Sequence, residues 1–150
     1  NRLVVTAKKK IQSKLRKSRT QARIMLVQAL YQMQLTDHDI NELLSQCRER
    51  EEYTKIDKRY FTKALRAIYK NSSEYQAEIE LHLDRSLIQI DPIELSILLL
   101  GYYELEEQKD IDTAVIINEA VNLTKRFGSQ DGHKYINAVL DRAGKTLRSV

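Results

Sequence analysis

Glycine and proline are rare in this chain, and their scarcity restricts what it can fold into. The 150 residues include four glycines and one proline. A fold with many tight turns depends on these two residue types, because glycine reaches unusual backbone angles and proline presets a turn. The apolar share of 42% is that of a globular chain. The composition therefore favours one helical domain over a many-turned all-β fold.

Hydrophobic periodicity predicts an all-α fold. Apolar residues recur at three- and four-residue spacings, the pattern of amphipathic helices. We find no strand alternation, no internal repeat and no second domain. We predict about seven helices, the first beginning at Ser18 or Thr20, over residues 18–35, 39–47, 57–69, 72–83, 91–105, 112–127 and 131–147.

The clearest helix start is Asp91-Pro92-Ile93-Glu94. An acid stands at the N-cap, proline at the first helical position and glutamate three residues after the cap, which are all favoured there. The segment that follows, 95–105, is apolar nearly all round. A helix without a polar face is usually buried, so we expect this one at the centre of the fold.

The charge of the chain is unevenly distributed. Residues 1–36 hold nine basic side chains and no acidic one: Arg2, Lys8, Lys9, Lys10, Lys14, Arg16, Lys17, Arg19 and Arg23. The rest of the chain, residues 37–150, therefore holds 25 − 9 = 16 basic residues and all 21 acidic residues. Its net charge is −5. Residues 1–17 show no sustained hydrophobic periodicity. We therefore expect a flexible basic arm at 1–17 and a single domain at 18–150. Such an arm suits a polyanion, although a solubilising tail is an equally open interpretation.

Signals for enzymatic chemistry are missing. The chain has no glycine-rich nucleotide loop and no HExxH zinc motif. His38, His82 and His133 are far apart, and Cys47 has no neighbouring base, so we expect neither a metal site nor a catalytic thiol. The lone cysteine fits a reducing cytoplasm, no signal-peptide pattern opens the chain, and its apolar runs are too short to span a bilayer. We predict a non-enzymatic cytoplasmic protein without a cofactor.

Two of the four glycines, Gly128 and Gly132, lie within six residues in the stretch FGSQDGHKYINAVLD. One helix is expected to stop at Gly128 and the next to begin near Asp131. The free N–H groups of a helix start suit phosphates, Lys134 can neutralise one, and the ring of Tyr135 can stack on an unpaired base. The alternative is that these side chains only cap, solvate and pack the helix.

Three stretches resemble the NusB family of bacterial transcription antitermination factors. They are ARIMLVQALYQMQL at 22–35, DPIELSILLLGYYEL at 91–105 and INEAVNLTKRFGSQDGHKYINAVLD at 117–141, and the similarity extends from about Ser18 to Ala143. The resemblance implies two packed helical bundles. It also implies an RNA-binding protein that binds boxA, a single-stranded element, together with NusE, a small-subunit ribosomal protein. That complex joins RNA polymerase and suppresses termination, notably in ribosomal RNA synthesis.

The resemblance also implies the residues that contact RNA. On the first helix it points to Arg19 and Arg23, and at the turn before the last helix to Asp131, Lys134 and Tyr135. The family often has a denser arginine run where this chain reads RTQAR, and Lys17 with its basic neighbours is expected to compensate. The family also often has phenylalanine in place of Tyr135 and glycine in place of Ala138.

For the protein partner, the resemblance points to Tyr31 and Glu94. NusE-type proteins are basic, which suits the acidic body of this chain. Both residues also have an ordinary interpretation, Tyr31 as core and Glu94 as a capping residue. Two other functions stay open from the sequence, a helical protein-interaction scaffold and an RNA-binding module like those fused to ribosomal RNA methyltransferases.

Overall fold

The computed structural model describes residues 1–128 and 131–148, and all the regular secondary structure of these residues is helical. Its α-helices are α1 (Arg2–Leu35), α2 (Ile40–Arg48), α3 (Lys58–Glu80), α4 (Pro92–Glu107), α5 (Thr113–Phe127) and α6 (Gly132–Leu147). Two 3-10 segments, Glu51–Lys55 and Leu87–Gln89, lie in the connections. The predicted all-α fold is confirmed.

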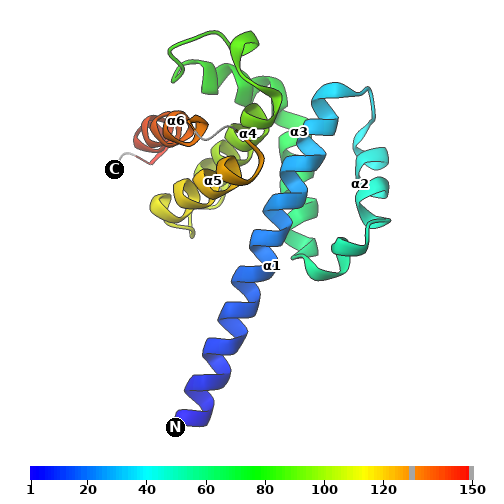
Figure 1. Cartoon of the computed structure of the whole chain (residues 1–150), viewed down its shortest axis with the longest axis vertical. Coiled ribbons are helices and arrows are strands. Elements are labelled where there is room, and N and C mark those ends of the chain that lie inside the picture. The colour runs from blue at the N-terminus through cyan, green and yellow to red at the C-terminus, as the bar shows by residue number, and fades with distance from the viewer. Residues whose placement is uncertain (129–130, 149–150) are drawn as a thin grey trace.

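Helix α4 is the centre of the molecule (Figure 1). It packs against α1 and α3 on one side and against α5 and α6 on the other, while α2 packs on α1 and α3. All its residues from Leu95 to Leu105 are buried, as its unbroken apolar sequence predicted. Gly101 allows a close approach of α6, because a Cβ there would lie 2.8 Å from Leu140 Cδ1.

Helix α3 joins two helices that the sequence predicted separately. The expected break before Ser72 is a kink at Asn71, whose backbone has φ −105° and ψ 15°. The Asn71 side chain donates to the carbonyl of Ala67 at 2.9 Å. No glycine or proline lies between 58 and 80 to end the helix. The described residues therefore form six α-helices, close to the predicted number of about seven.

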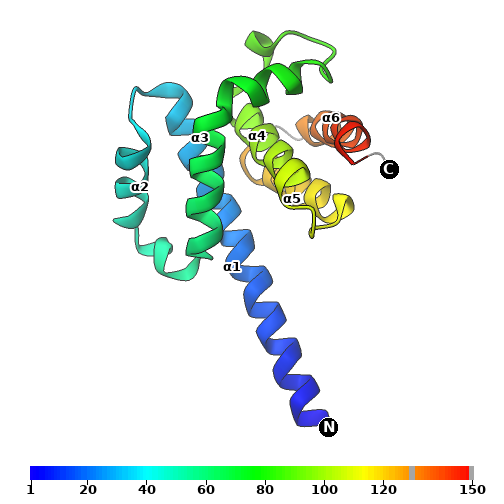
Figure 2. The ribbon, with the colours of Figure 1, turned by 180° about the vertical axis from the view of Figure 1, so that it is seen from behind.

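Helix α1 extends far beyond the body of the protein (Figures 1 and 2). It runs from Arg2, so the predicted start at Ser18 or Thr20 is wrong. Residues 1–17 are all exposed, and the first buried residue is Ala22. The change in pattern near residue 18 marks the point where packing begins, because no helix breaker precedes it. That residues 1–17 form a flexible arm separate from 18–150 stays a prediction.

The end of α4 is closed by a residue near the end of the chain. The guanidinium of Arg148 donates to the carbonyls of Glu104 at 3.1 Å, Leu105 at 2.9 Å, Gln108 at 2.9 Å and Ile111 at 2.6 Å. The last carbonyls of a helix have no partner within it, and a basic side chain satisfies them. Arg148 thus fixes α6 to the connection between α4 and α5.

Candidate nucleic-acid interface

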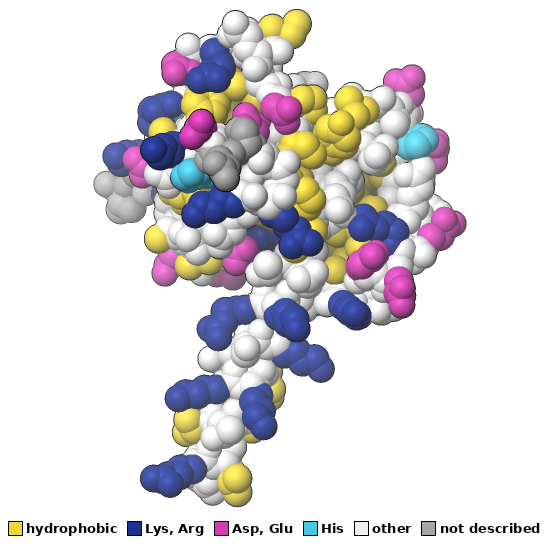
Figure 3. Space-filling model, viewed as in Figure 1, with side chains coloured by type: hydrophobic (Ala, Val, Ile, Leu, Met, Phe, Trp, Pro, Cys, Tyr) yellow, Lys and Arg dark blue, Asp and Glu magenta, His cyan; other side chains and the backbone are white. Residues whose placement is uncertain are grey.

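The predicted RNA-binding residues lie on two elements, α1 and the start of α6. Lys17 and Arg19 lie where the projecting half of α1 meets the body, and the exposed basic side chains of that half are visible in Figure 3. Helix α5 connects the two regions. Its Glu119 accepts a hydrogen bond from Thr20 of α1 at 3.2 Å, and its last residue leads into the turn before α6.

Arg19 is held in place but remains partly open to solvent. Its guanidinium lies over the ring of Tyr60, with the central carbon 4.2 Å from the ring centroid. It also forms an ion pair with Asp57 at 3.4 Å, and 33% of its side chain is exposed. Lys17, two residues earlier, is exposed. Both side chains can therefore reach an anion at the surface.

Arg23 lies in a different environment, although it is only one helical turn from Arg19. It is 4% exposed, and its guanidinium binds the Glu104 carboxylate at 2.9–3.2 Å and that of Glu119 at 3.5 Å. Tyr60 donates its hydroxyl to the same Glu104 carboxylate. Burial acts to lower the pKa of Arg23, but Glu104 and its neighbours outweigh burial and keep that pKa raised. Arg23 therefore ties α1 to α4 and α5 within the protein.

The turn between α5 and α6 has the predicted helix stop and start. The N–H of Gly128 donates to the Thr124 carbonyl at 2.6 Å and ends α5. A Cβ at position 128 would lie 3.0 Å from that carbonyl oxygen, so the close approach favours glycine. Residues 129 and 130 lie outside the described part of the chain. Asp131 is exposed at the N-cap position of α6, but its side chain accepts no capping hydrogen bond.

Lys134 and Tyr135 differ in how accessible they are. Lys134 is exposed, whereas Tyr135 is half-buried and packs against the core. The guanidinium of Arg85 lies over the Tyr135 ring, 4.2 Å from its centroid. Burial raises the pKa of the Tyr135 hydroxyl, and the charge of Arg85 opposes that shift. Arg85 was not predicted, because it is a single basic residue in a connection 50 positions away.

Glu94 is half-buried in the first turn of α4, close to the same cluster. The cap is Asp91, whose carboxylate accepts from the N–H groups of Ile93 at 2.8 Å and Glu94 at 3.4 Å. Burial and the charge of Asp91 raise the pKa of Glu94, while the charge of Arg85 acts against them. The N-cap of α4 is therefore Asp91, and Glu94 lies three residues after it.

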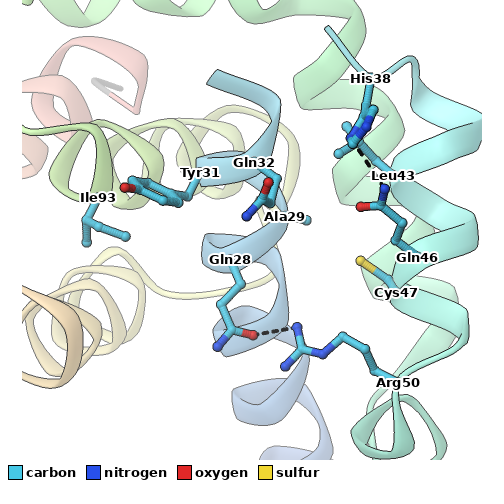
Figure 4. Close-up of a pocket in the computed structure, with 10 residues that line it drawn as sticks. All are labelled: Gln28, Ala29, Tyr31, Gln32, His38, Leu43, Gln46, Cys47, Arg50 and Ile93. Carbon is cyan, nitrogen blue, oxygen red and sulfur yellow. Dashed lines mark hydrogen bonds between the residues drawn. The ribbon is translucent and has the colours of Figure 1, made fainter. Parts of the chain in front are cut away.

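Tyr31 lines a groove between α1, α2 and the start of α4 (Figure 4). It is half-buried, and its ring points toward Ile93, the residue before Glu94. Gln28 accepts a hydrogen bond from Arg50 at 2.7 Å across the groove. The two residues predicted to bind the protein partner therefore lie on neighbouring elements, Tyr31 on α1 and Glu94 at the start of α4.

The described residues also include metal-ligating residue types and one thiol. None of their histidine, cysteine and carboxylate side chains form a group of three that could hold a metal. Cys47 of α2 is buried beneath the same groove, and burial raises the pKa of its thiol, which suits a structural residue. None of the described helices is both long enough and apolar enough to cross a membrane.

Comparisons with known proteins agree on one family. The model of the NusB family matches residues 20–145. A protein of Nitrosomonas eutropha named transcription antitermination protein NusB is 39% identical over 129 residues, which is 86% of this chain and 77% of the relative. A protein of the same name from Pseudomonas savastanoi pv. phaseolicola is 38% identical over 132 residues. The match covers 88% of this chain and 80% of the relative.

A solved structure supports the same conclusion. The structure of T. maritima NusB superimposes with a TM-score of 0.75 at 30% sequence identity. The match covers 84% of this chain and 89% of the T. maritima chain. The arrangement of helices around α4 is therefore shared with a protein of that family.

Proposed function

Because the chain belongs to the NusB family, we propose that it is a transcription antitermination factor that binds RNA and has no catalytic activity. The observation that supports this most is the family match across residues 20–145, which includes the turn before α6 and the acidic body. The RNA would be single-stranded and of boxA type, bound together with NusE. The complex would join RNA polymerase and suppress termination in ribosomal RNA synthesis, in the cytoplasm and without a cofactor.

For the RNA, we propose contacts of two kinds. Lys17 and Arg19 would neutralise phosphates, because both are basic and reach solvent beside the projecting half of α1. Lys134 would do the same at the start of α6, and the exposed carboxylate of Asp131 would accept a hydrogen bond from a base amino group. Arg23 would act indirectly by holding α1 on the body, since its guanidinium is used by two carboxylates.

For the protein partner, we propose the edge formed by Tyr31 and Glu94. A carboxylate there would attract a basic protein such as NusE, and the negative body of the chain would favour its approach. The Tyr31 ring is half-buried, so it offers an apolar contact beside that charge.

An equilibrium titration tests the proposal. The full chain is mixed with boxA-type RNA and with a scrambled RNA of the same length, each with and without NusE. We expect a preference for boxA that increases when NusE is present. A helical scaffold with an incidental basic tail would bind both RNAs equally, at the level that its charge predicts, and that outcome would refute the proposal.

A further inference from the structure

The connection between α3 and α4 places Arg85 on the first turns of α6. Its guanidinium carbon lies 4.2 Å from the centroid of the Tyr135 ring, within the range of a cation–π pair. The Arg85 Nε also donates to the Asp84 carboxylate at 3.0 Å. The guanidinium is thus held from two sides, by an aromatic ring and by a carboxylate.

Tyr135 is poorly placed to stack on a base itself. Its ring packs against the hydrophobic core and lies under Arg85, and its hydroxyl is buried without a hydrogen-bond partner. A base approaching the ring from the side of the guanidinium would first have to displace Arg85. The ring therefore acts as a support beneath the guanidinium.

Arg85 has the properties that a stacking surface needs. It is exposed at the surface, with 46% of its side chain accessible. Unpaired bases stack on guanidinium planes as well as on aromatic rings, and the positive charge adds attraction for the RNA backbone. A guanidinium already held by Asp84 and Tyr135 loses less conformational freedom on binding than a free one.

We propose that a base of the bound RNA stacks on Arg85, and that Tyr135 is the positioning residue that holds the guanidinium in place. This proposal rests on the RNA-binding function proposed above. It adds Arg85 to the site and changes the role of Tyr135 from a direct contact to an indirect one.

Binding of boxA-type RNA by the full chain tests the proposal with Arg85→Ala and Arg85→Lys. We expect Arg85→Ala to weaken binding about 5- to 140-fold, the range for losing one stacked base. Arg85→Lys should keep the salt dependence but lose most of the same affinity, because an ammonium group has no plane. Melting temperatures should stay close to the parent's, since Arg85 is exposed in a connection.

A double-mutant cycle separates the roles of Arg85 and Tyr135. If Tyr135 acts through Arg85, Tyr135→Ala should cost little further affinity once Arg85→Ala is present, and Tyr135→Phe should bind as the parent does. Equal or tighter binding by Arg85→Ala would overturn the proposal, and so would parental affinity in Arg85→Lys, which would indicate a phosphate contact. A parent chain that does not prefer boxA to scrambled RNA would instead refute the proposed function.

Discussion

The two halves of α1 belong to one continuous helix but differ in exposure, charge and packing. Residues 2–17 are exposed and rich in basic side chains, whereas the half from Ala22 onward has seven buried residues, six of them in the hydrophobic core. Arg19 and Arg23 lie on either side of the change. One is open to an anion, and the other is locked between carboxylates. The comparison shows that two arginines one helical turn apart can differ completely in burial and in the carboxylates that bind them.

The largest effect on folding is expected from Arg23→Ala. The substitution leaves the Glu104 carboxylate buried without its cation, and breaking a buried pair in this way costs about 3–5 kcal/mol of unfolding free energy. Chemical denaturation of both variants, with Arg19→Ala as the matched control, measures the difference. We expect Arg19→Ala to lose far less, because its ion pair is partly solvated.

A second substitution identifies the cause of that loss. Glu104→Gln in the Arg23→Ala background removes the stranded charge, so this double variant should be more stable than Arg23→Ala alone. If Arg23→Ala instead unfolds like the parent and weakens RNA binding, the arginine contacts RNA as the family resemblance implies, and the contrast between the two arginines disappears.

The sequence predicted the helices well because their apolar spacing and start signals are local. Asp91 with Pro92 located the start of α4, and the apolar run after it located the centre of the fold. The sequence does not reveal a contact whose partner lies far away along the chain. Arg23 belongs to the same basic series as Arg19, and only the fold brings Glu104, 81 positions away, to its guanidinium.

The candidate site shows the same limit. Lys134 and Asp131 were predicted from the turn and the family resemblance, and both side chains are exposed. Arg85 could not be predicted in this way. It lies in the loop after α3, and no local sequence signal indicates that it contacts the ring of Tyr135. The kink at Asn71 is a further case, since a serine pair there resembles a helix start but no breaker precedes it.

Deleting residues 1–17 tests the exposed half of α1 as a whole. It removes seven basic side chains, Arg2, Lys8, Lys9, Lys10, Lys14, Arg16 and Lys17. If all of them contact phosphates, the slope of log K against log salt should fall by up to about 5, at about 0.7 per contact with single-stranded RNA. Stability should change by less than about 0.5 kcal/mol, because no buried contact is lost.

The selectivity of that deletion is the sharper measurement. Phosphate contacts carry no direct sequence information, so boxA-type and scrambled RNAs should lose affinity by the same factor. A loss confined to boxA would assign base recognition to the projecting half of α1. The projecting half of α1 would then no longer differ from the start of α6, where base contacts are proposed.

Glu94→Lys tests whether the partner edge is distinct from both RNA regions. A lysine there repels a basic partner, so NusE affinity should fall roughly tenfold, while binding of RNA alone changes little. Glu94→Gln is the control, since it removes the charge but keeps the shape. Because Asp91 provides the cap, both variants should keep the start of α4. Parental NusE affinity in both variants would exclude Glu94 from the interface.

The smallest effect is expected from Arg19→Ala, and it tests the boundary between the two halves. One lost phosphate contact should reduce the salt slope by about 0.7 without changing the preference for boxA. Arg19→Lys keeps the charge but not the planar group over Tyr60, so it should restore the slope. An unchanged slope in Arg19→Ala would mean that the stack on Tyr60 and the ion pair with Asp57 fully occupy the guanidinium. Arg19 would then belong with Arg23 to the folding half of α1, and phosphate binding would begin at Lys17.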